Sequence, residues 1–357
     1  MEPSPTLALV VIARNEARCI ARCLLSARNF VDHMLVLDTG STDDTITVAA
    51  SCGAEVHQAE WTADFSVARN IALTLANADW NLVLDADEWI EEGGESLLAA
   101  RKVPPSIGVV LVISNDESTG QRFHSRSWIP RLLPRGVQYS GRIHEQPISG
   151  LLRVRIPLVL QHDGYNRSRL ADKIGRNRAL LLQDLESKPN DAYTLYQLGK
   201  DNEVYGDLPA AADYYLMALK LIRMDAMYRH DLSVRLIYCL SKTDRIDQAV
   251  LLAADQIGEW TESPDYFFAL GNLFLDKAVQ NPEQALEQWL PNAKDAWRRC
   301  LDIGERPELE GGIVGRGSFL AAHNLAVLHE EMGDRGKAEY FRSLSRELRS
   351  DIFNIKH

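Results

Sequence analysis

The stretch from Trp80 to Ile90, WNLVLDADEWI, constrains the fold more than any other part of the chain. Its apolar run ends at Leu84 and predicts a strand buried on both faces, followed by the acidic residues Asp85, Asp87 and Glu88. Such strands belong to parallel sheets, and open α/β sheets bind ligands at the edge where their strands end. Neighbouring carboxylates repel one another unless a cation lies among them, and oxygen ligands suit Mg²⁺ or Mn²⁺. The stretch therefore predicts a metal-binding sheet edge, with a solvated acidic turn as the alternative.

The composition is that of a soluble globular protein with room for two domains: 357 residues, 46% hydrophobic and 25% charged. A net charge of −11 disfavours a nucleic-acid partner or a polybasic membrane patch. The amino terminus has no basic segment ahead of its apolar run, and no run reaches the roughly 18 apolar residues that span a bilayer. Five cysteines without framework spacing fit a reducing compartment. We therefore expect a cytoplasmic protein with no transmembrane segment.

Strand and helix patterns alternate through the first part of the chain. The segments Leu7–Ile12, His33–Leu37 and Ala54–Gln58 predict strands, and the segments between them carry apolar residues at helical spacing. Ser41–Asp44 resembles a capping box that starts one of these helices. The alternation predicts a parallel sheet wound in the Rossmann manner. The glycine fingerprint of dinucleotide folds is missing from the sequence, which disfavours nicotinamide chemistry.

Further strands are expected after the acidic stretch. Ile107–Ser114 and Val154–Leu160 are apolar runs of strand length, and the polar residues 115–127 predict a loop or a short hairpin.

Four segments of the first half occur in the order and spacing of a known family. They read VVIARNEARCIARCLLS, VLDTGSTDDT, DFSVARN and WNLVLDADEWI. They resemble the nucleotide-diphospho-sugar fold (GT-A) of family 2 glycosyltransferases, over about residues 5–165. With GRIHEQ and tandem helices following, the chain is similar to bacterial glycosyltransferases that carry tetratricopeptide repeats, a neighbourhood that includes the S-glycosyltransferases of bacteriocin-like peptides. The resemblance implies a reaction class and leaves the substrate open.

The resemblance also implies where the donor binds. The pocket for its base and ribose would be lined by Ala13, Arg14, Asn15, Glu16 and Asp38. For Asp38, a structural cap at the strand end is the alternative.

The acidic stretch and one arginine would hold the rest of the donor. Asp85 would face the ribose and Asp87 would bind the metal ion. Arg69 either binds a phosphate or organises the pocket, or instead forms a salt bridge with Asp64 or with the acidic cluster.

An inverting transfer needs a base opposite the leaving diphosphate, within hydrogen-bond reach of the acceptor. Glu145 is the first candidate and His144 the second, while Glu88 and Asp87 remain alternatives. Glu88 could also support the metal ligands. His162 follows a late strand and is a candidate second metal ligand, because neutral imidazole suits Mn²⁺. The alternative for His162 is a cap at the domain boundary.

The second half is helical, so we expect a transferase domain over residues 1–165 and a repeat domain over residues 166–357. Residues 166–188 predict a long amphipathic linking helix, and residues 305–318 predict a loop that interrupts the repeats. Small and large residues recur as in four tetratricopeptide units, marked by Leu195, Leu198, Gly199, Ala211, Tyr215, Ala218, Leu236, Ala249, Ala253, Leu270, Gly271, Phe274, Ala293, Trp297, Cys300, Leu325, Ala326, Gly333 and Ala338. Such arrays bind protein segments or form homodimers, with a stabilising helical lid as the alternative.

The sequence thus predicts an α/β GT-A domain followed by an all-α repeat domain. The function it favours is a metal-dependent, inverting glycosyltransferase that uses Mn²⁺ or Mg²⁺ and moves a sugar from a nucleotide-diphosphate donor, a UDP-sugar first, to a peptide or protein. The inverting stereochemistry rests on the resemblance alone. Alternatives are a saccharide or lipid-linked acceptor in surface polysaccharide assembly, and a non-catalytic scaffold with a decayed transferase domain. A nucleotidyltransferase is disfavoured, because the first strand is not followed by a glycine-rich, lysine-bearing loop.

Overall fold

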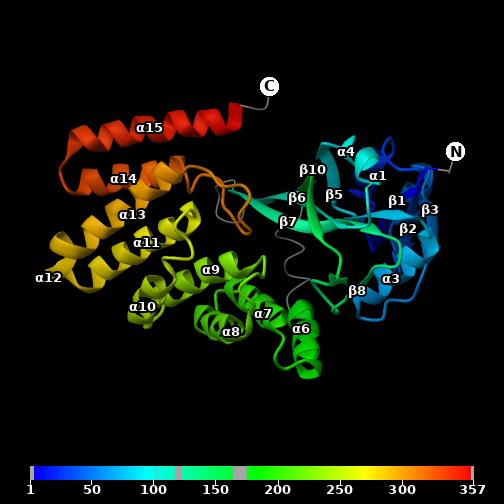
Figure 1. Cartoon of the computed structure of the whole chain (residues 1–357), viewed down its shortest axis with the longest axis horizontal. Helices are drawn as coiled ribbons and strands as arrows, with labels where there is room; N and C mark the ends of the chain where they lie inside the picture. The colour runs from blue at the N-terminus through cyan, green and yellow to red at the C-terminus, as the bar shows by residue number, and fades with distance from the viewer. Residues whose placement is uncertain (1–3, 102, 117–122, 164–174, 355–357) are drawn as a thin grey trace. The chain divides into compact units, whose positions relative to one another are not determined.

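The computed structural model describes residues 4–101, 103–116, 123–163 and 175–354 (Figure 1). The chain divides into two compact units, residues 1–187 and 188–357. The boundary falls at the end of the segment that we expected to link the domains, and helix α6 (Arg176–Ser187) counts with the first unit. Residues 166–174 of the expected linking helix lie outside the described residues.

An eight-stranded sheet, in the order β3-β2-β1-β4-β7-β6-β10-β5, forms the centre of the first unit. A separate two-stranded sheet pairs β8 with β9. The strands are β1 (Leu7–Ala13), β2 (His33–Asp38), β3 (Glu55–Gln58), β4 (Trp80–Asp85), β5 (Glu88–Glu92), β6 (Ile107–Asp116), β7 (Phe123–Pro134), β8 (Gln138–Ser140), β9 (Gln146–Ile148) and β10 (Arg153–His162). The α/β class predicted from the sequence is confirmed.

The sheet is parallel in one half and mixed in the other. Strands β1 to β4 pair in parallel, as their alternation with helices predicts. Strand β7 runs antiparallel to both β4 and β6, and β5 runs antiparallel to β10. The reason is local: β6 and β7 follow one another in the chain and pair antiparallel, while residues 117–122 between them lie outside the described residues. The alternation of the first half does not predict this mixed half, nor does it predict β5.

Helices cover both faces of the sheet, which explains why its central strands are continuously apolar. Helices α1 (Ile20–Ala27), α2 (Thr45–Ser51) and α4 (Ser96–Ala100) contribute to one core with every second residue of β1, and α3 (Phe65–Ala76) contributes to the other. Strand β4 is buried from Trp80 to Leu84, as predicted.

The expected capping box at the start of α2 does not form. The N-cap residue Asp44 makes no side-chain cap, and Asp43 Oδ1 instead accepts from the backbone N–H of Thr45 at 3.0 Å. The hydroxyl of Ser41 accepts from the backbone N–H of Asn15 at 2.8 Å. Ser41 therefore joins its loop to the loop that follows β1, and this bond takes the place of a cap on α2.

The register of the strands brings the predicted site residues to one edge. Ala13 of β1 lies opposite Asp38 of β2, and Ile12 lies opposite Asp85 of β4. In the last two strands of the sheet order, Glu88 of β5 lies opposite His162 of β10.

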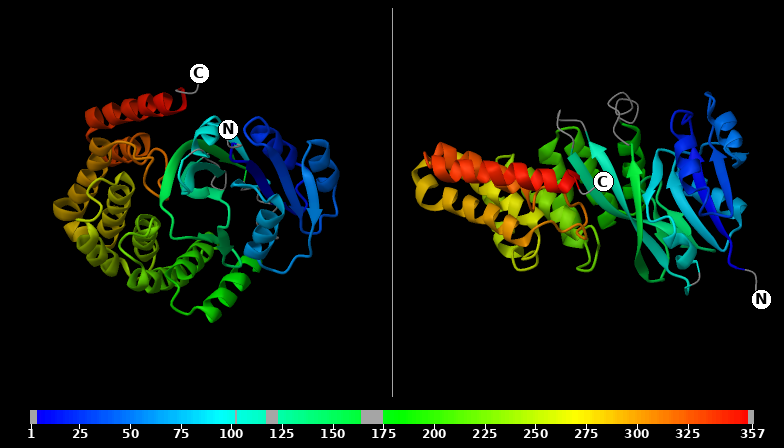
Figure 2. Two further views of the ribbon diagram at one scale, coloured as in Figure 1. Left: turned by 45° about the vertical axis from the view of Figure 1, so that its right-hand side comes forward. Right: turned by 90° about the horizontal axis from the view of Figure 1, so that it is seen from above.

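The second unit consists of paired helices, and the repeat units read from the sequence correspond to the pairs α7–α8, α9–α10, α11–α13 and α14–α15 (Figure 2). A short helix and a π-helical turn form the predicted insertion in the third pair. The bounds are α7 (Ala192–Val204), α8 (Leu208–Leu221), α9 (Arg229–Ser241), α10 (Ile246–Gln256), α11 (Pro264–Gln280), α12 (Pro282–Gln284), η1 (Ala285–Trp289), α13 (Leu290–Ile303), α14 (Phe319–Glu331) and α15 (Arg335–Asn354). Among the described helices, none combines the length and apolar character that a membrane crossing requires.

Two glycines let the paired helices approach closely. A Cβ atom on Gly199 would lie 2.3 Å from the ring of Tyr215, and one on Gly271 would lie 2.3 Å from the indole of Trp297. Both rings are fully buried. The small residues of the repeat pattern are therefore required by packing.

The packing at Gly271 can be tested by Gly271→Ala. Although alanine favours a helix by up to about 1 kcal/mol, we expect a net loss of about 1–3 kcal/mol of unfolding free energy, because the methyl group overpacks the core against Trp297. Gly258→Ala is the control, since no described atom lies within 4 Å of its Cβ position. Urea unfolding followed by circular dichroism measures both variants, and equal stability of the two would contradict this account.

Candidate active site

Two arginines surround the carboxylate at the end of β4. Arg69 of α3 donates from Nη2 to Asp85 Oδ1 at 2.5 Å, and Arg131 of β7 donates from Nη2 to Asp85 Oδ2 at 2.6 Å. Burial acts to raise the pKa of Asp85, but the charges of Arg131 and Arg69 outweigh it and hold the pKa well below its ordinary value. Asp85 is therefore ionised and fixed in place. Arg69 forms the salt bridge to the acidic cluster that was one of its two predicted roles.

Glu88 belongs to the same network and is almost fully enclosed. Its side chain is 2% exposed; Oε1 accepts from Arg131 at 2.5 Å and Oε2 accepts from the backbone N–H of Asp85 at 3.0 Å. Burial raises the pKa of Glu88 above its ordinary value, and the charge of Arg131 offsets this only in part. Glu88 thus supports the turn around Asp85 from inside the protein.

The loop between β8 and β9 carries the two candidate bases. Glu145 accepts from Nε of Arg69, so a single guanidinium bridges Asp85 and Glu145. The Glu145 side chain is only 9% exposed, and its Oε2 has no hydrogen-bond partner in the described part of the chain. His144 is exposed and lies in the left-handed region at φ 51°.

Arg142 anchors this loop from two sides. Its backbone N–H donates to Asp184 of α6 at 2.8 Å, and its carbonyl oxygen accepts from the N–H of Phe65, the first residue of α3, at 2.8 Å. The loop that carries Glu145 is therefore fixed to the helix that carries Arg69.

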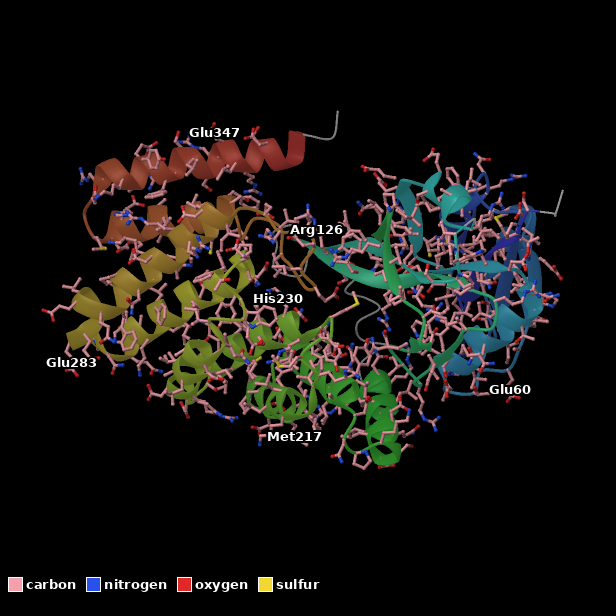
Figure 3. All side chains as sticks on the ribbon, viewed as in Figure 1. Glu60, Arg126, Met217, His230, Glu283 and Glu347 are labelled. Carbon is pink, nitrogen blue, oxygen red and sulfur yellow. The ribbon has the colours of Figure 1, made fainter. Side chains whose placement is uncertain are left out.

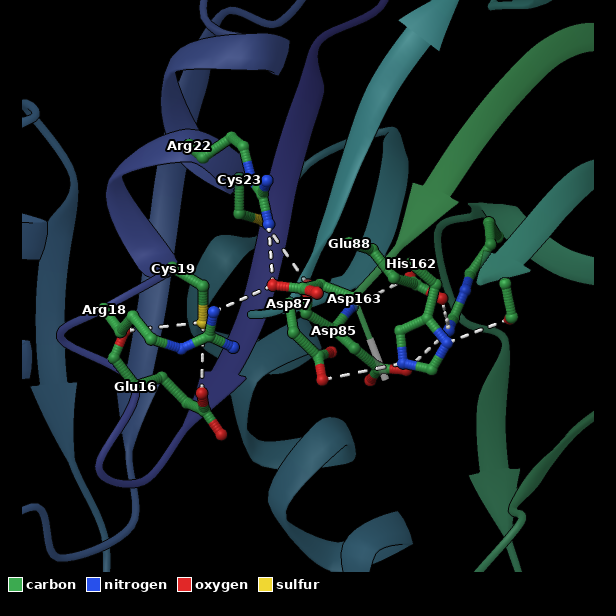
Figure 4. A network of polar contacts seen from close by, with 12 residues as sticks. Glu16, Arg18, Cys19, Arg22, Cys23, Asp85, Asp87, Glu88, His162 and Asp163 are labelled. Atoms are coloured by element: carbon green, nitrogen blue, oxygen red, sulfur yellow. Dashed lines mark hydrogen bonds and ion pairs between the residues drawn. The ribbon is translucent and has the colours of Figure 1, made fainter. Parts of the chain in front are cut away.

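Asp87 and His162 form a second, separate pair. His162 Nε2 lies 3.5 Å from Asp87 Oδ2, and the two side chains point toward one another (Figure 4). Ser114 contacts the other ring nitrogen, Nδ1, at 3.1 Å. Burial acts to lower the pKa of His162, but its hydrogen bond to Asp87 and the charge of that carboxylate raise it above the ordinary value. The pairing of β5 with β10 explains this proximity.

The residues predicted for the base pocket lie at the ends of β1 and β2. Asn15, at φ 57°, accepts through Oδ1 from the N–H of Thr42 at 2.7 Å. Asp38 is 1% exposed; Oδ1 caps the backbone N–H groups of Gly40 and Ser41, while Oδ2 is buried without a hydrogen-bond partner among the described residues. The capping role weighed for Asp38 is thus present in one oxygen and leaves the other available.

The remaining members of that set differ in exposure. Ala13 is buried at the end of β1, and Arg14 is exposed. Glu16 Oε2 lies 3.1 Å from the sulfur of Cys19, in the same network as Asp87 and His162 (Figure 4). Burial and this contact raise the pKa of the Cys19 thiol to about 12, so the sulfur stays protonated.

The sequence reading assigned no role to Arg131, Ser114 or Tyr139. Arg131 interrupts the apolar run from Ile129 to Leu133, which signals a buried cation that needs acidic partners. Ser114 ends an apolar strand and carries no such signal. The ring of Tyr139 lies beneath Arg69, with 5.5 Å between the guanidinium carbon and the ring centre.

Residues 8–155 match the family model described as glycosyl transferase family 2. The first unit therefore carries a glycosyl transferase family 2 domain.

Two relatives each match more than two thirds of this chain. The chain is 33% identical over 258 residues to a TPR repeat-containing protein of Synechococcus elongatus, covering 68% of this chain and 64% of the relative. It is 26% identical over 264 residues to the SPbeta prophage-derived glycosyltransferase SunS of Bacillus subtilis, covering 70% and 62%. This chain spans less than two thirds of the length of both relatives.

Two solved structures show weaker likeness. The crystal structure of MamA has a TM-score of 0.41 at 16% identity, covering 54% of this chain and 99% of that chain. Glucosyl-3-phosphoglycerate synthase from Mycobacterium tuberculosis has a TM-score of 0.27 at 24% identity, covering 31% of this chain and 43% of that chain. These scores are too low to bear on fold or function.

The buried ion network can be tested by Arg131→Met. We expect a loss of about 3–5 kcal/mol of unfolding free energy, because the change leaves the buried carboxylate of Glu88 without its cationic partner and leaves Asp85 with Arg69 alone. Arg135→Met is the matched control: its ion pair with Asp79 is about half exposed, so its loss should cost about 0–1 kcal/mol. Urea unfolding measures both variants, and similar losses would show that the network contributes no more than a surface pair.

Proposed function

We propose that this chain is a metal-dependent glycosyltransferase that moves a sugar, with inversion, from a nucleotide-diphosphate donor to a peptide or protein. The observation that carries the proposal is the arrangement at the end of β4: Asp85 is held by two arginines, and Asp87 faces His162 in a family 2 domain. The cytoplasmic location expected from the sequence belongs to this proposal and fits five buried cysteine thiols.

Two buried polar atoms support the donor-binding role of this edge. Asp38 Oδ2 and Arg69 Nη1 have no hydrogen-bond partner among the described residues. A buried polar atom without a hydrogen-bond partner costs about 1–3 kcal/mol of free energy. A ligand that supplies the missing partner removes this cost, and its binding is stabilised accordingly. A nucleoside offers N–H and hydroxyl donors to Asp38, and a phosphate offers acceptor oxygens to Arg69. A UDP-sugar is our first choice of donor.

Asp87 and His162 fit a divalent ion. A carboxylate oxygen and an imidazole nitrogen form a donor set that suits Mn²⁺, and Ser114 orients the ring by contacting its other nitrogen. The described residues contain no cluster of three or more potential ligand side chains, so donor phosphates and water would complete the coordination. When bound, the ion offsets the negative charge that develops on the leaving diphosphate, a contribution of several kcal/mol.

Glu145 is the residue that we propose as the general base. Arg69 holds one of its oxygens, which fixes the carboxylate, and Oε2 is the oxygen that would accept the acceptor's proton. Glu88 is less suited because both of its oxygens are already bonded inside the protein. His144 is the second candidate, since it is exposed on the same loop.

The helical repeats support a peptide or protein as the acceptor, since stacked repeats form extended surfaces that bind protein segments. A homodimer through the repeats remains part of the proposal. A saccharide or lipid-linked acceptor is the alternative within the same reaction class, and a decayed, non-catalytic scaffold is the alternative outside it. Either transferase, with a peptide or with a saccharide or lipid-linked acceptor, should bind and hydrolyse the donor, whereas a decayed scaffold should not.

The metal role is tested by Asp87→Asn. We expect donor hydrolysis and transfer to fall by roughly 10²–10³-fold, which corresponds to losing a Lewis-acid contribution of several kcal/mol. The assay screens UDP-, GDP- and dTDP-sugars with Mn²⁺. Asp79→Asn at the opposite end of β4 is the control and should retain activity. Full activity in Asp87→Asn would remove the metal role of this residue.

The base is tested by Glu145→Gln, which preserves the shape of the side chain and an oxygen that Arg69 can bind. We expect kcat to fall by about 10²–10⁴-fold, because proton removal is lost. The donor KM should change little, because Asp85 still holds Arg69 in place. His144→Gln should have a small effect by comparison. An unchanged kcat in Glu145→Gln would assign the base elsewhere, and the anomeric configuration of the product, determined by NMR, tests inversion.

A further inference from the structure

Residues 304–318, the segment between α13 and α14, lie across the first turns of two earlier helices of the second unit. In the left view of Figure 2 this orange segment lies inside the curve that the helices form. It meets α9 and α11, which are the first helices of the second and third pairs (Figure 3 labels His230 at the start of α9). The sequence predicts a loop here, and the structure shows that the loop is seated on other repeats.

The helices recognise the backbone of this segment. His230 Nδ1 lies 2.9 Å from the carbonyl oxygen of Glu310, and Asp265 Oδ1 accepts from the backbone N–H of Ile313 at 2.9 Å. The same Asp265 oxygen accepts from the guanidinium of Arg316 at 3.0 Å. A carbonyl, an N–H and one cationic side chain are the groups that a bound peptide offers to a receptor.

A glycine allows the closest approach. Gly311 has φ +72°, and a Cβ atom at this position would lie 2.1 Å from Oδ1 of Asp231. Asp231 is itself fixed by the hydroxyl of Tyr196 and by Nε of Arg235, the latter at 2.7 Å. Only a residue without a side chain fits over this carboxylate.

The side chains under the segment are polar yet buried. Tyr196, His230, Asp231, Ser263 and Asp265 are all less than 5% exposed. Ser263 Oγ contacts His230 Nε2 at 2.6 Å, which fixes the ring that meets Glu310. A helix pair needs only apolar contacts to pack, as around Trp297. A prearranged set of buried acids and hydroxyls that meets backbone groups instead has the character of a binding site.

We propose that the first turns of α9 and α11 form a peptide-binding site that residues 310–316 of the same chain occupy as an internal ligand. A peptide partner enters by displacing that segment. The peptide that fits is extended, has a glycine over Asp231, and carries a basic residue that reaches Asp265. This site is the one through which the repeats engage a peptide acceptor, a step that rests on the proposed function, whereas peptide binding itself does not depend on sugar transfer.

The test uses the full chain and a labelled synthetic peptide with the sequence of residues 305–318. Gly311→Ala should release the internal segment, because the added methyl group collides with the carboxylate of Asp231. Gly333→Ala is the matched control: it also has a positive φ, +77°, but no described atom lies within 4 Å of its Cβ position. Fluorescence anisotropy measures peptide binding to each variant and to the unaltered chain.

We expect Gly311→Ala to bind the peptide about tenfold more tightly than the unaltered chain and the Gly333→Ala control, a difference of about 1.4 kcal/mol. Adding Asp265→Ala to Gly311→Ala should abolish this binding. Equal affinity of all the chains, or no binding to a folded Gly311→Ala chain, would overturn the proposal.

A second measurement applies if Gly311→Ala does not fold. In the unaltered chain, saturating free peptide should accelerate hydrogen exchange at the N–H of Ile313, because competition breaks its bond to Asp265. Unchanged exchange would show that the segment is a fixed structural insertion. Both readouts are independent of sugar transfer, so their failure leaves the transferase proposal standing, and failure of the donor assays leaves the peptide site standing.

Discussion

The pairing of two buried arginines with the carboxylates at the end of β4 is the constraint on which the candidate site depends. Asp85 at a strand end could repel its acidic neighbours, but Arg69 and Arg131 neutralise it from the two sides. A buried charge without a partner is costly, so each of these groups requires the others. The network therefore joins helix α3, strand β4, strand β7 and the loop that carries Glu145 into one rigid edge.

This pairing also separates two kinds of acid. Asp85 and Glu88 are occupied by arginines, whereas Asp87 faces a histidine whose orientation Ser114 helps to set. A cation is therefore not needed to neutralise Asp85 and Glu88, because arginines already do so. We propose that a metal ion binds two residues after Asp85, where the chain turns from β4 to β5 and Asp87 faces His162. The edge therefore has one part that is held by ion pairs and one part that we propose binds a metal ion.

The sequence predicts the first half of the fold well, because a strand buried on both faces is marked by a continuous apolar run. It also predicts that Asp38, Asp85 and Asp87 come to one edge, since parallel strands end on the same side. Arg131 could have been assigned, because a lone arginine in an apolar strand demands acidic partners. The antiparallel pairing of β5 with β10 could not be predicted, because pairing between strands distant in sequence leaves no local pattern. The sequence therefore did not show which residue lies next to His162.

In the second unit, too, the features set by nearby residues are predicted from the sequence, whereas contacts between residues far apart in sequence are not. The spacing of small residues predicts the helix pairs, because Gly199 and Gly271 are required where rings pack against a helix. The seating of Gly311 on Asp231 joins residues 80 positions apart in sequence and is visible only in three dimensions.

The most direct test of the central claim is a calorimetric titration of the chain with UDP, in Mn²⁺ and again with the metal chelated. We expect binding in Mn²⁺ and its loss on chelation, because in our proposal Asp87 and His162 would hold the ion that binds the diphosphate. Absence of binding under both conditions, or equal binding in both, would contradict the assignment of this sheet edge as a metal-dependent donor site.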